Sequence, residues 1–442
     1  MPWSEAEAER HLHSLELFGM RFGLDRMRRM MTVLGSPERR FDTIHVVGTN
    51  GKTSTTRMIA AILERHGLRT GAYTSPHLMS YTERVQVGER DLPSEAFAAA
   101  IARAAWAAER VNRTLSEDDH VTQFELLTAA AFWELAERGV EVAVIEAGLG
   151  GRYDATSVIS SQLTVLTNVG LEHTRWLGPT VRDIAGEKLA VLREGTTLVL
   201  GADLAPEALE VAVTVAAERS ASIVRVPDVS DTVALLARGS FQQRNFALAR
   251  AAAEAYLRGA DATAGRAEQG AAQGDAHERA LLEAAAQTVV PGRLQVLDGE
   301  PLTVLDGAHN PDAVAALVES LPEVLGGRPT ALVLGVLEDK DAAGMLAALL
   351  GVCERAWFTA PASSRALSPA ALQSLARQLG FEQVACEPVP WRALEEARRW
   401  ASERGGAVLV TGSVYLVGEL LGRLGGGHGL DGAEPLRRGS AG

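Results

Sequence analysis

The sequence predicts an α/β protein with two domains, each built on a mostly parallel sheet. Short apolar segments typical of buried strands alternate with longer amphipathic segments typical of helices, and this alternation occurs in two series. A chain of 442 residues is also too long for one ordinary core. The expected strands are 44–47, 142–146, 163–167, 197–200 and 222–226 in the first series, and 302–305, 331–334, 356–359 and 408–411 in the second.

The two series meet near residues 290–300, where Pro291-Gly292-Arg293 interrupts the pattern. Residues 259–277 are rich in Gly, Ala and Gln, and we expect a long surface loop or a partly helical segment there. The last residues lack apolar periodicity. We therefore expect an N-terminal domain over 1–292, a smaller Rossmann-like C-terminal domain over 293–424 and a disordered tail over 425–442. The helices expected in the first domain are 55–65, 94–109, 124–137 and 181–192.

Composition excludes several classes of protein. A hydrophobic fraction of 47% and a charged fraction of 22% are ordinary for a soluble globular chain. The net charge of −13 argues against a nucleic-acid partner. Only Cys353 and Cys386 are present, which argues against a disulfide framework or a cysteine-based metal cluster. No signal-peptide pattern or membrane-length apolar run is seen, so we expect a cytoplasmic protein without membrane association.

The segment G-T-N-G-K-T-S at residues 48–54 follows an apolar strand and precedes a helix. In this context backbone N–H groups and the helix dipole face the phosphates of a nucleotide, the lysine reaches their outer oxygens, and the first threonine after it can bind Mg²⁺. The first domain is therefore predicted to be P-loop ATPase-like and to bind ATP. The alternative is a glycine turn followed by a surface lysine. The residues assigned to the nucleotide are Thr49, Asn50, Gly51, Lys52, Thr53 and Ser54.

A second glycine-rich segment, A-G-L-G-G-R-Y-D-A-T at residues 147–156, follows a strand that ends on Glu146. A carboxylate at the carboxyl end of a strand near a phosphate loop is well placed to hold Mg²⁺. The glycines let the backbone pass close to a ligand. The alternative is a glycine turn beside an incidental glutamate.

These motifs resemble those of the folylpolyglutamate synthase and dihydrofolate synthase family, within the Mur ligase superfamily. The phosphate loop is two residues shorter than the general P-loop between its glycines, as in that superfamily, and residues 148–156 resemble the family's G-L-G-G-R-L-D-A-T with Tyr153 replacing Leu. Other matches follow in the family's order: T-S-P-H-L at 74–78, E-R-V at 83–85, T-Q-F-E at 122–125, E-H-T at 172–174, E-K at 187–188, Q-Q-R-N at 242–245, P-G-R at 291–293, D-G-A-H-N-P at 306–311, D-K-D at 339–341 and T-G-S at 411–413.

The resemblance implies ATP-dependent amide formation. A substrate carboxylate attacks the γ-phosphate to give an acyl phosphate, and the amine of L-glutamate then displaces phosphate. Dihydropteroate, reduced folates, or both would be the acceptors, and we expect a monomer. Three alternatives stay open: an enzyme that only extends polyglutamate tails, a Mur-type ligase of UDP-muramoyl compounds, and a P-loop ATPase that is no ligase. The short stretch before the phosphate loop leaves little room for a separate UDP-sugar domain.

The resemblance also implies two Mg²⁺ ions. Glu146 and Ser75 would hold the first, with Thr53, while His173 and a carbamylated Lys188 would hold the second. Carbamylation by CO₂ requires a neutral amine, which a partly buried lysine with a lowered pKa supplies. Taken alone, His173 would be an ordinary loop histidine and Lys188 a solvated lysine.

Four further residues receive roles from the resemblance. Asn245 would contact the adenine, Arg293 a phosphate, and Asp306 the ribose or base. Asn310-Pro311 is typical of an N-cap and first helical residue, so the Asp306 loop should precede a helix. His309 could support catalysis, with Lys52 and Lys188, or only stabilise its loop.

The remaining assignments concern the acceptor. Three segments of the sequence match family segments that touch dihydropteroate, and Phe22 and Phe124 could stack on a flat ring or belong to the core. The assigned residues are Arg21, Phe22, Gly23, Leu24, Thr122, Gln123, Phe124, Glu125, Tyr153, Asp154 and Ala155.

Overall fold

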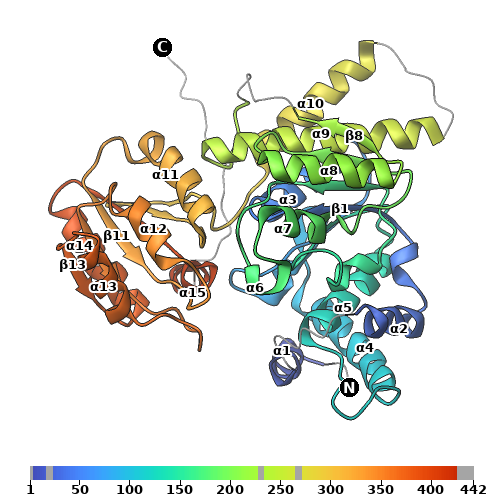
Figure 1. Ribbon diagram of the computed structural model, residues 1–442, viewed down its shortest axis with the longest axis horizontal. Helices are drawn as coiled ribbons and strands as arrows, with labels where there is room; N and C mark the ends of the chain where they lie inside the picture. The colour runs from blue at the N-terminus through green and yellow to red at the C-terminus, as the bar shows by residue number, and fades with distance from the viewer. Residues whose placement is uncertain (1–2, 16–22, 227–232, 264–270, 426–442) are drawn as a thin grey trace, which may run out of the picture. The chain divides into compact units, whose positions relative to one another are not determined.

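The chain forms two compact α/β units, Met1–Pro291 and Gly292–Gly442, in a computed structural model that describes residues 3–15, 23–226, 233–263 and 271–425 (Figure 1). The α/β class with mostly parallel sheets is thereby confirmed. Arg21, Phe22 and the expected tail after residue 425 lie outside the described residues. Among the described helices, none is long and apolar enough to cross a membrane.

The sheet of the first unit has the strand order β4-β3-β2-β5-β1-β6-β7-β8. β1 (Asp42–Val47) lies in its interior, between β5 (Val142–Glu146) and β6 (Leu163–Leu166), and both pairs are parallel. β2 (Thr70–Tyr73), β7 (Thr197–Leu200) and β8 (Ser222–Arg225) continue the parallel arrangement. A short antiparallel hairpin, β3 (Val85–Val87) and β4 (Arg90–Asp91), forms one edge. The phosphate loop and the Glu146 segment therefore leave neighbouring strands at the same edge of the sheet.

Helices cover both faces of this sheet, because successive residues of its interior strands point to opposite faces and are all buried. Ile44 and Val46 pack with α3 (Lys52–Arg65), α9 (Ser240–Thr263) and α10 (Ala271–Gln287). On the other face, Tyr73 and Ile145 pack with helices that include α1 (Glu5–Ser14), α2 (Asp25–Leu34), α4 (Ser94–Asn112) and α5 (Gln123–Glu137). Farther along that sheet, α7 (Val181–Leu189) and α8 (Pro206–Glu218) cover Leu166 and Leu198. Shorter segments are α6 (Thr174–Leu177) and the 3₁₀ turns Pro37–Arg39, Tyr81–Arg84 and Ala155–Val158.

The second unit is a six-stranded sheet of order β13-β12-β11-β14-β10-β9. Its strands are parallel except for the edge strand β9, which is antiparallel to β10. The elements are β9 (Gln295–Leu297), β10 (Leu302–Leu305), α11 (Pro311–Leu325), β11 (Thr330–Leu334), α12 (Ala342–Leu349), β12 (Arg355–Phe358), α13 (Pro369–Gln378), β13 (Val384–Cys386), α14 (Pro390–Ser402), β14 (Ala407–Thr411) and α15 (Val414–Gly425).

The segment expected as a long loop is more helical than predicted. α9 continues to Thr263 and α10 already begins at Ala271, so the described part of residues 259–277 is helical. Alanine supplies the explanation, because its helix propensity outweighs that of the scattered glycines. Cys353 and Cys386 are free thiols.

Candidate active site

The phosphate loop turns directly into α3, with Gly51 as the residue before the helix. Gly51 has φ +80°, and a Cβ there would lie 2.5 Å from Oδ1 of Asn245 on α9. A side chain at this position would therefore be strained in the backbone and would also collide with Asn245. Lys52 is the first residue of α3, and its Nζ donates to the Thr49 carbonyl at 3.0 Å. The loop, Lys52 and Asn245 thus lie together, as the sequence predicts for a nucleotide site.

The segment after β6 braces this loop through polar side chains. The Asn50 amide donates to Oδ1 of Asn168 at 2.8 Å, and the Thr167 hydroxyl donates to the Asn50 carbonyl at 2.6 Å. The Thr49 hydroxyl accepts from the Gly170 amide at 3.0 Å. Sequence reasoning assigned no role to Thr167 or Asn168. The sequence feature that could have identified them is their position immediately after an apolar strand that ends beside the phosphate loop.

Glu146 closes β5 with its side chain only 1% exposed. The Thr53 hydroxyl lies 3.1 and 3.0 Å from its two carboxylate oxygens, and the Ser75 amide donates to Oε2 at 3.1 Å. Thr53 and Ser75, which were assigned with Glu146 to one Mg²⁺, therefore both contact its carboxylate, Ser75 through its backbone amide. Carboxylate and hydroxyl oxygens are the donors that Mg²⁺ prefers, so the donor set fits that ion.

Lys188 lies on α7 with only 5% of its surface exposed, and its Nζ donates to the Gly48 carbonyl at 2.6 Å. Burial, helped by the charge of Lys52, lowers the pKa of this amine to about 7, while Glu172 and Asp154 oppose the change. A substantial fraction of Lys188 is therefore a neutral amine near neutral pH.

His173 precedes α6 in the left-handed conformation, with φ +53°. Its Nε2 lies 3.8 Å from Oε1 of Glu172, the same glutamate whose charge acts on Lys188. The left-handed backbone turns the chain sharply between β6 and α6. Glu172 was not assigned a role from the sequence, although it stands next to the assigned histidine.

The glycine-rich turn after Glu146 packs against Phe124 of α5. A Cβ on Gly148 would lie 2.5 Å from Cζ of Phe124, so the ring rests directly on the turn. Tyr153 is 48% exposed, whereas Asp154 and Ala155 are buried. The exposed tyrosine and the partly exposed Phe124 are the aromatic groups of this region that a flat acceptor could reach.

The other assigned residues at the start of α5 have structural contacts. Thr122 and Glu125 form a capping box, and Nε of Arg26 donates to both Glu125 oxygens at 3.0 Å. The Gln123 amide donates to the Leu12 carbonyl at 2.7 Å. These three side chains are thus engaged in packing α5 against α1 and α2. Gly23 and Leu24 immediately precede α2, with Leu24 as its N-cap.

The second unit gathers its assigned residues around the loop after β10. Asp306 is buried, and its carboxylate accepts from the Leu294 and Ala308 amides, each at 2.7 Å. Burial raises the pKa of Asp306, against the opposing charge of Arg293. Nδ1 of His309 lies 2.8 Å from the Gly307 carbonyl. Asn310 caps α11 and Pro311 is its first residue, which confirms that local prediction.

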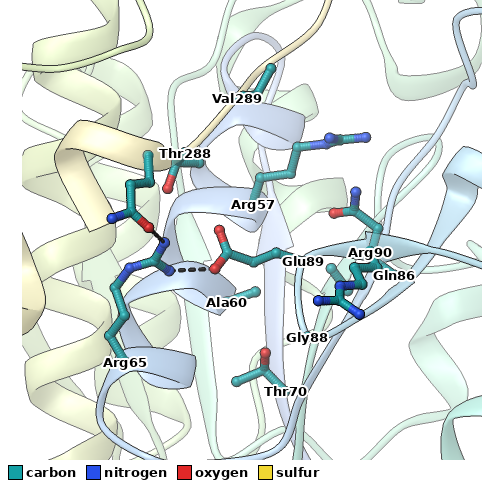
Figure 2. A pocket seen from close by; sticks show the side chains of 12 residues that line it. Arg57, Ala60, Arg65, Thr70, Gln86, Gly88, Glu89, Arg90, Thr288 and Val289 are labelled. Carbon is teal, nitrogen blue, oxygen red and sulfur yellow. Dashed lines mark hydrogen bonds and ion pairs between the residues drawn. The ribbon is translucent and has the colours of Figure 1, made fainter. Parts of the chain in front are cut away.

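A cavity of about 290 Å³ lies elsewhere in the first unit, beside α3, β2 and the β3–β4 turn (Figure 2). Its charged lining includes Arg57, Arg65 and Arg90, and Arg65 pairs with Glu89 and donates to Oε1 of Gln287. The lining contains none of the residues assigned to the nucleotide, the metal or the acceptor. We therefore do not place the chemistry in this cavity.

Comparison with known families agrees with this geometry. Residues 46–205 match the Mur ligase middle domain, and residues 292–414 match the Mur ligase glutamate ligase domain. The folylpolyglutamate synthase of Lacticaseibacillus casei is 32% identical over 84% of this chain and 88% of its own. The dihydrofolate synthase/folylpolyglutamate synthase of Bacillus subtilis is 30% identical over 95% of this chain and 98% of its own. A probable bifunctional folylpolyglutamate synthase/dihydropteroate synthase of Haloferax volcanii is 35% identical over 93% of this chain, which spans 50% of that relative.

Solved structures give the same result. Mycobacterium tuberculosis folylpolyglutamate synthase complexed with ADP has a TM-score of 0.86 at 30% identity, covering 95% of this chain and 98% of its own. Escherichia coli FolC in complex with DHPP and ADP has a TM-score of 0.81 at 28% identity, covering 96% and 98%. The bifunctional Yersinia pestis enzyme complexed with AMPPNP and Mn ion has a TM-score of 0.79 at 28% identity, covering 96% and 98%.

The two-unit α/β fold, the phosphate loop and the buried carboxylate beside it define an ATP-dependent ligase of the Mur type. Such ligases form amide bonds at the expense of ATP. Within that class, the chain belongs to the folylpolyglutamate synthase and dihydrofolate synthase family.

Proposed function

We propose that this enzyme adds L-glutamate to dihydropteroate and to reduced folates through an acyl phosphate, releasing ADP and phosphate. The observation that carries the proposal is the contact of Thr53 and Ser75 with the buried Glu146, beside a phosphate loop that begins α3. The names of the bifunctional relatives and the complex of the E. coli protein with DHPP and ADP support the choice of acceptors.

The phosphate loop would hold ATP with its γ-phosphate toward Glu146 and Lys52. Lys52, freed from the Thr49 carbonyl, would donate to the transferring phosphoryl group and offset its growing charge. Thr53, Ser75 and Glu146 would hold one Mg²⁺, and His173 with carbamylated Lys188 a second. When bound, these ions neutralise phosphate charge. The Mn complex of the Yersinia relative supports a divalent metal in this family.

Carbamylation of Lys188 is part of the proposal. The neutral amine attacks the carbon of CO₂, so that a C–N bond forms while one C=O π bond opens to a C–O⁻, and the nitrogen gives a proton to solvent. An anionic carbamate then stands where the neutral amine was. The burial of Lys188 and its pKa of about 7 support this step, because they make the neutral amine available at ordinary pH. The adjacent Lys52 would then face an anion rather than another cation.

The acceptor would lie against the turn over residues 148–153, where Phe124 and the exposed Tyr153 can contact a flat ring. Asp154, Ala155 and the Thr122–Glu125 segment would shape this site from behind. We also propose that Asn245, Arg293 and Asp306 contact the nucleotide, and that His309 assists the catalytic lysines. For each of the three nucleotide contacts, substitution should raise the KM for ATP more than the KM for glutamate.

The decisive experiment measures ADP release with MgATP, L-glutamate and each candidate acceptor, with products weighed by mass spectrometry. Turnover with both dihydropteroate and tetrahydrofolate supports the bifunctional enzyme. Turnover with tetrahydrofolate alone restricts it to tail extension. Turnover only with a UDP-muramoyl compound, or ATP hydrolysis independent of any acceptor, would refute the proposal.

Two variants link that activity to the site. Lys52→Ala and Glu146→Ala should each lower kcat about a hundredfold or more, because they remove charge compensation at the transferring phosphoryl group. Melting temperatures should stay near the wild-type value. Full activity in either variant would contradict the assignment.

We also propose a cellular location, an oligomeric state and a class of partner for the enzyme. The two free cysteines and the net charge of −13 favour a cytoplasmic monomer that uses small molecules and binds neither nucleic acid nor membranes. Light scattering on the purified protein tests the oligomeric state, and fractionation of cells tests the location. A stable oligomer or membrane-bound activity would contradict this proposal.

A further inference from the structure

His45 lies in the middle of β1 with only 1% of its surface exposed. It is paired with Ile145 on β5 and Thr164 on β6, so it stands on the interior of the sheet. A buried imidazole needs a hydrogen-bond partner. Nε2 of His45 finds one in the hydroxyl of Thr156, at 2.9 Å.

The direction of the His45–Thr156 hydrogen bond follows from the hydrogen bond between Thr156 and Asp154. The Thr156 hydroxyl also lies 2.5 Å from Oδ1 of Asp154, and a carboxylate can only accept. With Asp154 ionised, the hydroxyl donates to it, and the matching assignment places a proton on Nε2 of His45, which donates to Thr156. Burial lowers the pKa of His45 to about 3, which agrees with a neutral imidazole.

Asp154 connects this buried pair to the glycine-rich turn. Its Oδ2 accepts from the Leu149 amide at 2.7 Å, and its Oδ1 accepts from the Thr156 amide at 3.0 Å. One carboxylate therefore joins the first and last parts of the turn. The chain of contacts runs from the interior of the sheet to the segment that carries the exposed Tyr153 and supports Phe124.

We propose that His45, Thr156 and Asp154 form a positioning relay that fixes the turn over residues 148–153 and so sets the affinity for the flat aromatic acceptor. This inference rests on the proposed function, which places the acceptor at that turn. All three residues act through the turn: the carboxylate of Asp154 is occupied by backbone and threonine donors. The nucleotide loop has its own brace in Thr167 and Asn168, so the relay affects the acceptor more than ATP.

The test replaces Thr156 with residues that differ only in the hydroxyl or the methyl group. Thr156→Val keeps the shape and removes the relay, whereas Thr156→Ser keeps the hydroxyl. Thr164→Val is the matched control, because Thr164 is a fully buried neighbour of His45 whose hydroxyl has no hydrogen-bond partner among the described residues.

We expect Thr156→Val to raise the KM for dihydropteroate or tetrahydrofolate about tenfold, since a lost buried hydrogen bond lets the turn move. The KM for ATP should stay within about twofold, and Thr156→Ser and Thr164→Val should resemble the wild type. The inference is overturned if Thr156→Val leaves the acceptor KM unchanged, raises both KM values alike, or is matched by Thr164→Val.

Hydrogen exchange on the wild-type protein supplies a second measurement that needs no variant. The Leu149 amide should exchange at least about a hundredfold more slowly than an open-loop amide, because Asp154 holds it. Exchange at the open-loop rate would overturn the relay. If the wild type turns over neither acceptor but protects Leu149, the proposed function fails and only the structural relay stands, so the two failures can be told apart.

Discussion

Replacing Lys188 by methionine should change the pH dependence of stability in a calculable way. In the folded protein the pKa of Lys188 is about 7, against an ordinary value of 10.5. A difference of this size corresponds to about 5 kcal/mol between the charged and neutral amine. Methionine has a similar length and no charge, so Lys188→Met removes the free-energy cost of the buried ammonium.

The sign follows from proton binding. Between about pH 7 and 10.5 the unfolded amine holds a proton that the folded one has lost, so wild-type stability rises by about 1.4 kcal/mol per pH unit in that range. Below pH 7 the buried ammonium exerts its full destabilising effect. The advantage of Lys188→Met over the wild type should therefore be largest near pH 6 and should shrink by about 2–3 kcal/mol by pH 9.

The assay is urea unfolding of both proteins from pH 6 to pH 9 in CO₂-free buffer with a chelator, followed by hydrogen exchange of peptides from β1 and β6. Arg182→Met, an exposed cation on the same helix, is the control and should show no such pH dependence. Adding bicarbonate should stabilise only the wild type. A stability difference between Lys188→Met and wild type that does not vary with pH would refute the reasoning.

Three further substitutions follow from buried contacts. Glu125→Ala should lower the free energy of unfolding by about 3 kcal/mol, because it leaves the buried Arg26 guanidinium without this partner, and an unchanged urea midpoint would contradict that. Gly51→Ala should raise the KM for ATP about tenfold, because its Cβ would meet Asn245 and its φ is +80°; ADP affinity equal to wild type by calorimetry would contradict this. Asp306→Asn should destabilise the second unit by about 1–3 kcal/mol, since an amide has one acceptor oxygen for two backbone donors, and thermal unfolding checks it.

The interior of both sheets could be predicted from the sequence because its strands are continuous apolar runs. Residues 142–146 are all buried, and the predicted strand there has the observed bounds. The edge strand β8 was predicted over residues 222–226, but the edge strands β4, β9 and β13 were not. β4 consists of Arg90 and Asp91, which are both exposed, and only pairing with β3 makes them a strand.

Part of the site could be predicted from the sequence with the rule that ligands gather at the carboxyl ends of parallel strands. From that rule we expect Glu146 to lie close to Lys52 and Thr53. It cannot pair His45 with Thr156, because their contact depends on how a turn folds back under the sheet. Thr122 and Glu125 were assigned to the acceptor from the sequence, whereas in the structure both side chains form the capping box of α5.

The strand order has a consequence for how the enzyme loses activity on heating. The phosphate loop and Glu146 leave β1 and β5, which are interior neighbours in the sheet. Their separation requires the sheet to break in the middle, whereas the β3–β4 hairpin can fray alone at the edge. Inactivation and cooperative melting of the first unit should therefore be one event, and the catalytic geometry should persist until the whole unit unfolds.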